Sequence, residues 1–530
     1  MDINSIAPYT DRQQEMSTIS SPTLFSIFTV SAIALFAGYA KRKSLRPLSY
    51  PPGPKGLPFL GSIFEINASE PWLTFTRWAQ THGDLVYCTL FGRPFLIIQT
   101  TDVAKALLEQ RSTVYSDRPP VKVHKDVGSE FNSALLRYGE KWRLHRRLFH
   151  QSFRADAAQD YLPTQLRKAR QLLIGIYNSP DRYQRQIELY ASGVIMSAVY
   201  DYETIPNDDP LVLAAERAID VFVKVAGPST AALLEAFPFL LKLPAWFPGA
   251  TLKRMAIQAK SNLHEMMDVP FRYARDRVMS SVSGRCMVSE SLKRFPESNT
   301  EGFQVALKSS SATAFIAGVE TTASTLIIFV LAMMRYPEVQ ERAQKEIDAV
   351  IGTHRLPNFD DRSSLSYIDA VLRETLRWHP VFPLCLPHYT TKSDVYEGKY
   401  IPEGCVVLAN VWAMSRDEVK YPNPTEFIPE RFIDQDGQLN NDSVALAFGF
   451  GRRVCVARHF ADASVWMAIV HLLAVFKFMK PLDENGVEMD PNPEWSTGVV
   501  SHPLELKCRV VPRIPGMDAD KLMEMTQCSD

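Results

Sequence analysis

The residues best suited to chemistry form one short stretch near the C-terminus, Phe448-Gly449-Phe450-Gly451-Arg452-Arg453-Val454-Cys455, which leads into an apolar helical pattern from Ala457 onward. A cysteine at a helix N-terminus and beside arginines has a lowered pKa, because backbone N–H groups, the positive helix end and nearby cations favour the anion. Such a thiolate can hold haem iron from one side. Gly449 and Gly451 would allow tight or left-handed backbone under a flat ring, and Phe448 would shield the sulfur from water.

Two other interpretations of this stretch remain open on the residues alone. Cys455 could be a buried structural cysteine, since free cysteine is among the most buried residue types. The stretch could also be a phosphate-binding loop, although Gly449-Phe450-Gly451 lacks the third glycine and the preceding strand that such a loop needs.

A long apolar helix, predicted from about Gly302 to Tyr336, carries the second candidate site, Ala317-Gly318-Val319-Glu320-Thr321. The small pair Ala317-Gly318 would leave a groove for a diatomic molecule. Thr321 can donate to a carbonyl of the preceding turn or to oxygen in the groove, and Glu320 can supply protons through water. A transmembrane span is the rival interpretation, but a charge at its centre costs about 2.5–3.5 kcal/mol on insertion scales. A hydroxyl satisfied only by its own helix is the plain alternative for Thr321.

A basic helical segment places Trp142 and Arg146 four residues apart and therefore on one face. A solvated, charged face with one aromatic residue packed inward is the usual fate of such a pattern. The neighbouring Lys141, Arg143 and Arg147 could form a basic surface for an acidic redox partner.

The pair Glu374 and Arg377 lies on a further predicted helix that Ser366 could cap. In isolation the pair is a surface salt bridge worth ~0–1 kcal/mol. Downstream, Arg431 stands in Pro429-Glu430-Arg431-Phe432. These residue types alone indicate no chemistry.

Taken together, the motifs resemble those of the cytochrome P450 family. Its haem-ligating signature, F-x-x-G-x-R-x-C, is present as Phe448, Gly451, Arg453 and Cys455. The order and the spacing both match. One departure is Ala457, where the family usually has glycine; its methyl group could press on the haem or tilt the following helix.

The resemblance implies a role for each motif. Cys455 would be the axial thiolate ligand of a haem (iron protoporphyrin), and Thr321 and Glu320 would deliver protons during oxygen activation. The haem propionates would be bound by Trp142, Arg146, His388 and Arg453. Glu374, Arg377 and Arg431 would form a network that supports the cysteine loop. The substrate pocket would be lined by Phe315, Ala317, Val319, Val381, Phe382, Leu384 and Val499.

The N-terminal part predicts a membrane anchor. From Pro22 to Ala40 the chain is apolar and uncharged, close to the ~20 residues that cross a bilayer. Lys41, Arg42, Lys43 and Arg46 follow it, so the positive-inside rule places the rest of the chain in the cytosol. A signal peptide is the alternative, but its basic residues would precede the apolar run. We therefore expect a lumenal tail at 1–21, a single-pass anchor at 22–40, a basic and proline-rich hinge at 41–62, a haem-binding catalytic domain at 63–515 and a C-terminal tail at 516–530.

The remaining chain must position these motifs, and its pattern is mostly helical. We expect a helix from Pro71 to Gln80 and a hairpin from Leu85 to Gln99, broken at Gly92-Arg93-Pro94. Helical spacing then prevails from Thr101. The apolar, proline-rich stretch from Pro238 to Pro248 is either core or, by resemblance, a linker that dips into the membrane. The predicted fold class is mainly α with a smaller β-rich region, the cytochrome P450 fold.

Composition narrows the classes of function. With 530 residues, 46% of them apolar, the chain can bury a large core, and its net charge of -1 does not favour nucleic acid as a partner. Seven cysteines, an odd number without a C-x-x-C pair, indicate neither a disulfide framework nor a zinc site, and fit a reducing, cytosol-facing environment.

By resemblance, the function expected is that of a haem-thiolate monooxygenase of the endoplasmic reticulum membrane, similar to fungal microsomal enzymes that modify terpenoids and other secondary metabolites. Its partners would be an NADPH-dependent reductase, dioxygen and a small hydrophobic substrate. Two alternatives stay open: a haem-thiolate isomerase or dehydratase that needs no reductase, and a non-catalytic haem-binding membrane protein.

Overall fold

The computed structural model describes residues 48–206, 208–227, 230–231, 233–234, 237–295 and 300–527. The predicted tail at 1–21, the anchor at 22–40 and the basic residues of the hinge up to Arg46 lie outside the described residues. The described chain divides into a main body, 51–394 with 401–527, and a small unit, 48–50 with 395–400. Within the small unit, the Tyr400 backbone N–H donates to the Ser49 carbonyl oxygen at 2.9 Å.

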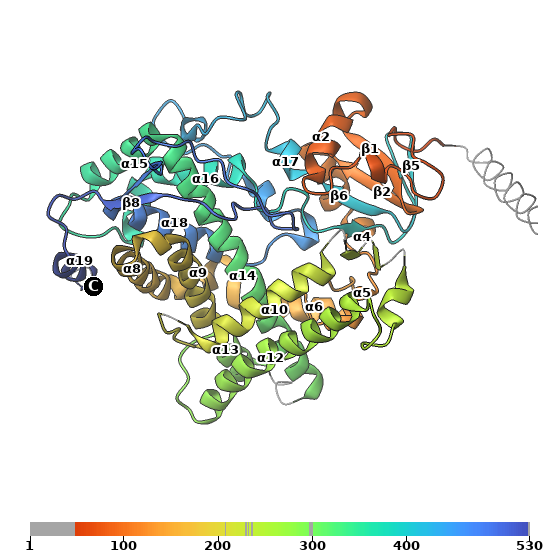
Figure 1. Cartoon of the computed structure of the whole chain (residues 1–530), viewed down its shortest axis with the longest axis horizontal. Helices are drawn as coiled ribbons and strands as arrows, with labels where there is room; N and C mark the ends of the chain where they lie inside the picture. The colour runs from red at the N-terminus through yellow and green to blue at the C-terminus, as the bar shows by residue number, and fades with distance from the viewer. Residues whose placement is uncertain are drawn as a thin grey trace, which may run out of the picture. The chain divides into compact units, whose positions relative to one another are not determined.

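Helices dominate the main body (Figure 1). The longer ones are α2 (Pro71–His82), α6 (Glu140–Phe153), α8 (Leu162–Asn178), α9 (Tyr183–Tyr200), α10 (Pro210–Ala226), α12 (Thr251–Met279), α13 (Met287–Arg294), α14 (Glu301–Arg335), α15 (Pro337–Val350), α16 (Ser366–Trp378), α18 (Arg458–Val475) and α19 (Ala519–Gln527). Short helices are α3 (Thr101–Ala104), α4 (Ser112–Tyr115), α5 (Val123–Asp126), α7 (Ala155–Ala158) and α17 (Val411–Met414). Short 3₁₀ helices include η5 (Pro238–Lys242), η8 (Pro429–Phe432), η9 (Ala445–Phe448) and η10 (Gly451–Arg453), and η2 (Lys105–Gln110) is a short π-helix.

The β-rich region is a four-stranded sheet with the order β1 (Leu85–Leu90), β2 (Arg93–Ile98), β6 (Val406–Ala409) and β3 (His388–Tyr389). β1 and β2 form the predicted hairpin, and β2 pairs in parallel with β6, so that Ile97 lies opposite Leu408 (Figure 1). Two smaller sheets pair β4 (Asp394–Tyr396) with β5 (Lys399–Ile401), and β7 (Phe476–Met479) with β8 (Arg509–Pro512). The expectation of a mainly α fold with a smaller β-rich region is thus confirmed for the described residues.

α14 (green in Figure 1) forms the centre of the core and packs beside α9 and α18. Every residue from Thr322 to Met334 is buried, as is every residue of α18 from Ala463 to Val475. A helix that is apolar on all sides must be enclosed by protein or lipid. α14 is long and apolar enough to cross a membrane, and 67% of its most apolar window is buried inside the protein. Burial of α14 inside the protein therefore explains its apolar composition, as expected for a core helix.

Helix ends follow from local chemistry, with one correction. α2 begins at Pro71, because proline at the first helical position has no N–H to satisfy, and it stops before Gly83, whose φ is 89°. The predicted cap of α16 by Ser366 is wrong, since Ser366 is the first helical residue. Glu346 of α15 instead accepts the backbone N–H groups of Tyr367 and Ile368, at 2.8 and 3.0 Å. A neighbouring helix thus satisfies the free N–H groups of this N-terminus.

The proline-rich apolar stretch from Pro238 to Pro248 is only partly core. Leu241 is buried, whereas Phe239 is 57% exposed and Trp246 is 80% exposed. The interpretation of this stretch as ordinary core is therefore wrong for its aromatic residues.

Candidate functional site

A cavity of about 340 Å³ lies in the main body, between α6, α14, α16, α18 and the loop that ends at Cys455. Its lining is mostly apolar and includes Phe149, Ile195, Ala317, Val381 and Phe382. Most of the motifs singled out in the sequence meet at this cavity.

The loop that carries the cysteine depends on two glycines with positive φ. Gly449 and Gly451 have φ values of 79° and 58°. A Cβ at Gly451 would lie 2.0 Å from the carbonyl oxygen of Leu108 in η2, so only glycine fits there. The close approach at Gly451 is therefore to protein backbone. The loop closes when the Cys455 N–H donates to the Phe448 carbonyl oxygen at 2.8 Å.

The predicted lowering of the pKa of Cys455 is not observed. Burial raises this pKa, while the Ala457 backbone N–H, Arg146 and Arg458 act in the opposite direction with smaller effect. Loss of hydration thus outweighs the helix end and the arginines. A metal cation bound to the sulfur would favour the thiolate.

Ala457 occupies an ordinary backbone conformation. It is the N-cap of α18, with φ −93° and ψ 18°, a conformation open to any residue. Its side chain lines the cavity. Alanine in place of the family's usual glycine therefore causes no backbone strain.

Two arginines connect the cysteine loop to the cavity. Arg146 Nη1 donates to the Val454 carbonyl oxygen at 2.7 Å. Arg453 donates from Nε to the Ser116 carbonyl oxygen and from Nη2 to the Leu136 carbonyl oxygen, both at 2.8 Å. The Arg453 guanidinium carbon also lies 4.5 Å from the centre of the Trp142 ring. Trp142 and Arg146, predicted to share one face of α6, both line the cavity.

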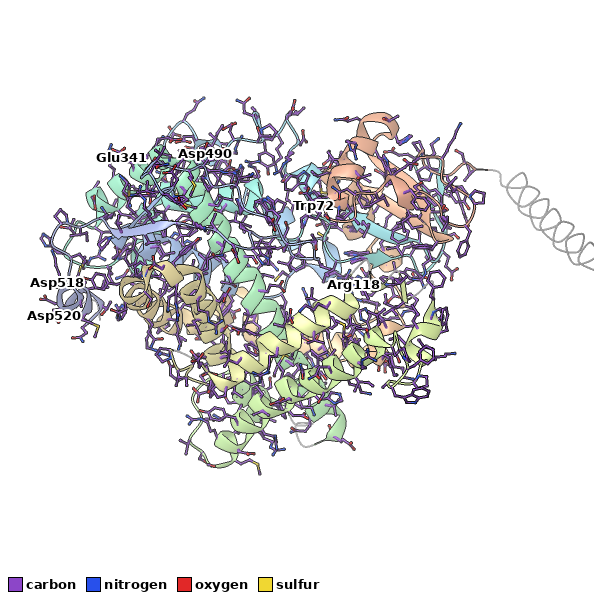
Figure 2. All side chains as sticks on the ribbon, viewed as in Figure 1. Trp72, Arg118, Glu341, Asp490, Asp518 and Asp520 are labelled. Atoms are coloured by element: carbon purple, nitrogen blue, oxygen red, sulfur yellow. The ribbon has the colours of Figure 1, made fainter. Side chains whose placement is uncertain are left out.

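A third arginine, Arg118 (labelled in Figure 2), was not predicted. It lines the cavity and is 5% exposed. Its Nε donates to the Ala134 carbonyl oxygen at 2.8 Å, and its Nη1 donates to the carbonyl oxygens of Leu386 and Pro387. Arg118 precedes Pro119-Pro120, in a segment without helical or strand periodicity, so no pattern indicated its direction.

These three arginines give the cavity a positive charge that the nearby Asp117 carboxylate offsets only in part, since Asp117 is paired with Arg137. In the part of the chain that the structure describes, none of them forms an ion pair with a carboxylate, and the Nη1 of Arg453 is buried without a hydrogen-bond partner. Burial and the neighbouring Arg453 lower the pKa of Arg118 to about 9, and burial lowers that of Arg453 to about 10. The two propionate carboxylates of a haem would supply the missing negative charge, so these residues fit that group.

His388 lies on the same cavity in its neutral form. It is 4% exposed, and its Nδ1 is 2.8 Å from the Tyr115 carbonyl oxygen, which can only accept. Nδ1 therefore carries the hydrogen, and Nε2 has a lone pair and can only accept a hydrogen bond while the ring is neutral. Burial and Arg118 lower the pKa of His388 to about 3. A hydrogen bond from Nε2 to a propionate would require the imidazolium, which a nearby carboxylate favours.

One face of α14 forms a wall of the cavity. Its members, spaced by one and by three residues, are Thr313, Ala314, Ala317, Gly318, Thr321, Thr322 and Thr325. The Thr321 hydroxyl donates to the Ala317 carbonyl oxygen at 2.7 Å. A Cβ at Gly318 would lie 2.8 Å from Ile195 of α9, so this glycine also permits close packing of the two helices.

Glu320 stands apart from the ion pairs of the fold. Its carboxylate has no hydrogen-bond or ion-pair partner among the described residues, and burial raises its pKa. It is half-buried and is not among the residues that line the cavity. A carboxyl group in this state can hold and release a proton nearer to neutral pH than an exposed one.

The structure places some of the predicted substrate-pocket residues at the cavity and others away from it. Ala317, Val381 and Phe382 line the cavity. Phe315 is fully buried against the Tyr200 ring, and Val319 packs against the core. Leu384 packs against the hydrophobic cluster under the sheet, and Val499 is 38% exposed.

Glu374, Arg377 and Arg431 meet in a buried network. Arg377 donates to both oxygens of Glu374, at 2.6 and 2.7 Å, and Arg431 Nε donates to Glu374 Oε1 at 3.2 Å. Both Glu374 and Arg377 are 0% exposed, so the interpretation of the pair as a surface salt bridge is wrong. Arg377 also donates to the backbone carbonyls of Ser415, Pro424 and Glu426. The network therefore holds the chain segment that leads to η8.

Comparisons with known proteins agree on one family. A family model described as Cytochrome P450 matches residues 51–510. Cytochrome P450 monooxygenase COX2 of Coprinopsis cinerea is 35% identical over 494 residues, covering 92% of this chain and 93% of the relative. Cytochrome P450 monooxygenase claR of Ampulloclitocybe clavipes is 36% identical over 504 residues, covering 93% and 92%. Tryptamine 4-monooxygenase of Psilocybe cyanescens is 34% identical over 484 residues, covering 90% and 95%.

We predict that Arg377→Met destabilises the fold by about 3–5 kcal/mol, because it leaves Glu374 buried without its bidentate partner. The matched control is Lys345→Met, which removes an exposed i,i+4 pair with Glu341 and should change the free energy of unfolding little. Urea unfolding followed by circular dichroism measures both. Equal unfolding midpoints for the two variants would show that the network does not support the fold.

Proposed function

The chain belongs to the cytochrome P450 family and is a haem-thiolate monooxygenase, and on that premise we propose that it inserts one oxygen atom from dioxygen into a small hydrophobic substrate, with electrons from NADPH through a reductase. The observation that carries the proposal is the meeting of Cys455, three unpaired arginines and Thr321 at one apolar cavity. When bound, the haem supplies the activation of dioxygen and the transfer of one oxygen atom to carbon.

Residues around the cavity would hold the cofactor by complementary charge. Cys455 is proposed as the iron ligand, in the loop shaped by Phe448 and Gly451. Arg118, Arg146 and Arg453 would bind the propionates. Trp142, against whose ring the Arg453 guanidinium stacks, would fix the orientation of that side chain, and His388 would join them as the imidazolium.

Thr321 and Glu320 are proposed to manage protons. The Thr321 hydroxyl already donates its hydrogen to the Ala317 carbonyl, so it can accept a hydrogen bond from water while remaining in place. Glu320, unpaired and with a raised pKa, would hold a proton and pass it through water toward the cavity. An isomerase or dehydratase would need neither group in this state.

The cavity wall supports an apolar substrate. Phe149, Ile195, Ala317, Val381 and Phe382 exclude water from the space beside Thr321. The named relatives are fungal, and one of them acts on tryptamine by its name. We propose a secondary metabolite, such as a terpenoid, as the substrate.

The proposed location is the endoplasmic reticulum membrane, with the catalytic domain in the cytosol. The apolar run at 22–40 and the basic residues after it support a single-pass anchor. The exposed Phe239, Trp246 and Phe247 support a second contact with the bilayer, because aromatic side chains favour the interface.

The proposed docking surface for the reductase is the exposed face of α6. Lys141, Arg143 and Arg147 are exposed on the side away from the cavity. The Arg143 guanidinium lies 5.9 Å from the Tyr138 ring, and Arg452 lies 5.4 Å from the same ring and donates to the Tyr138 hydroxyl. Because Arg452 precedes Arg453 in the cysteine loop, the basic surface adjoins the cofactor site.

Arg143→Glu is expected to slow NADPH-supported reduction about three- to tenfold at low salt, because a reversed charge reduces electrostatic steering toward an acidic partner. Reduction by dithionite, which needs no docking, should not change. The same charge reversal on α12, Arg275→Glu, is the matched control. If the rate of NADPH-supported reduction is unchanged in Arg143→Glu, α6 is not part of the docking surface for the reductase.

Thr321→Ala is expected to lower the product formed per NADPH at least about tenfold and to raise the release of hydrogen peroxide, because proton transfer loses its positioned hydroxyl. Ser324→Ala is the control, since Ser324 lies one turn further along α14, is buried and does not line the cavity. Incorporation of labelled oxygen from dioxygen is measured in parallel. Turnover that needs no NADPH would contradict the proposed function and support the isomerase or dehydratase, and absence of any product across a substrate panel would support the non-catalytic alternative.

A further inference from the structure

Two hydroxyl groups interrupt the apolar wall of the cavity at one place. Ser133, on the loop before α6, and Thr313, on α14, both line the cavity. The Ser133 backbone N–H donates to Thr313 Oγ1 at 3.0 Å, and the Ser133 hydroxyl lies 3.4 Å from the same atom. Behind them lies His145, whose Nδ1 is 2.7 Å from Ser133 Oγ.

Thr313 has no hydrogen left to donate. Its hydroxyl donates to the Ser309 carbonyl oxygen at 2.9 Å and accepts from the Ser133 backbone N–H. Thr313 therefore holds the loop against α14, and Ser133 is the hydroxyl that can respond to a ligand.

His145 determines what Ser133 can offer. It is fully buried, its Nε2 has no partner among the described residues, and burial and Lys141 lower its pKa to about 4, so it is neutral at physiological pH. If the hydrogen is on Nε2, the Ser133 hydroxyl donates to Nδ1 and keeps two lone pairs. If it is on Nδ1, Ser133 accepts that bond, points its hydrogen at Thr313 and keeps one lone pair.

Ser133 can thus accept a hydrogen bond in either tautomer. It can donate one only in the second, and only by giving up its 3.4 Å contact with Thr313. The neutral imidazole adds no positive charge that would attract a carboxylate. This part of the wall therefore favours ligands that carry a hydrogen-bond donor.

We propose that Ser133 accepts a hydrogen bond from a hydroxyl or N–H group of the substrate, and that this contact places the oxidised carbon at the other end of the molecule. Thr313 and Thr321 are eight residues apart on α14, a rise of about 12 Å along the helix. The substrate would be a mainly apolar molecule with one donor group roughly that far from the reacting carbon. The inference rests on the proposed monooxygenase function and narrows its substrate class.

The test uses the haem-loaded full chain and two isomeric probes, 1-decanol and 1-methoxynonane, of which only the first is a donor. Affinities are taken from the shift of the haem Soret band on titration. Ser133→Ala should weaken 1-decanol about five- to tenfold, the loss of one hydrogen bond, and change 1-methoxynonane less than about twofold. Ser133→Thr, which keeps a hydroxyl, should retain the preference. Ser311→Ala, a buried serine of α14 that does not line the cavity, is the control.

With NADPH and reductase, wild-type protein should oxidise 1-decanol at the carbons far from its hydroxyl, and Ser133→Ala should lose this selectivity. If Ser133→Ala does not retain haem, the proposal is tested on wild-type protein alone, by its preference for 1-decanol over 1-methoxynonane and by the position of the oxidised carbon. Equal wild-type affinities for the two probes would overturn the proposal. A spectrum of the reduced protein with carbon monoxide, recorded on the same samples, distinguishes failure of this inference from failure of the proposed function. A red-shifted Soret band together with equal affinities for the two probes would contradict only the role of Ser133. Absence of that band in wild-type protein would contradict the proposed function as well.

Discussion

The burial of positive charge without an equal negative charge is the constraint on which the site depends. Arg118, Arg146 and Arg453 line one cavity. The guanidinium group of each also donates hydrogen bonds to backbone carbonyl oxygens of the cysteine loop or of neighbouring segments. Removing such a cation from water costs several kcal/mol unless an anion compensates it. Burial lowers the pKa of all three arginines, because loss of hydration disfavours the charged guanidinium relative to the neutral form. A cofactor with two carboxylates, bound at these arginines, would therefore stabilise the folded structure as well as complete the active site.

A second group of buried arginines has a carboxylate of the chain itself as its partner. Glu374 lies between Arg377 and Arg431, and the Ile428 backbone N–H adds a further bond to its Oε1 at 2.7 Å. Here two arginines share one carboxylate, and the remaining Arg377 hydrogens bind carbonyls of the segment from Ser415 to Glu426. Both groups of arginines bind backbone carbonyls. They differ in that Arg377 and Arg431 share a carboxylate, whereas Arg118, Arg146 and Arg453 line the cavity without an ion-pair partner among the described residues.

The sequence was most informative where one geometric rule decides the outcome. Trp142 and Arg146 share a helix face because they are four residues apart, and Gly451 could be recognised because no other residue fits its backbone. Helix periodicity also separates two of the predicted pocket residues, Phe315 and Val319, from the cavity. Phe315 and Val319 are each two residues from Ala317, which on a helix turns them about 200° away from the cavity.

Loop residues were harder still, since a loop has no period. Arg118 could not be predicted, because its direction is set by carbonyls of Ala134, Leu386 and Pro387 that are distant in sequence. The pKa of Cys455 likewise depends on burial by the whole fold, which a local motif does not reveal. Tertiary packing, not local sequence, determines both properties.

Ligation of the haem iron by Cys455 at this cavity can be tested with the spectrum of the reduced protein bound to carbon monoxide. Two cysteines line the cavity in the described part of the chain, Cys455 and Cys385, so each can serve as the control for the other. If Cys455 is the ligand, we expect a Soret band at the red-shifted position of thiolate ligation in wild-type protein and in Cys385→Ala, and its loss in Cys455→Ala. A band at the position of histidine-ligated haem in wild-type protein, or a red-shifted band that survives Cys455→Ala, would contradict ligation by Cys455.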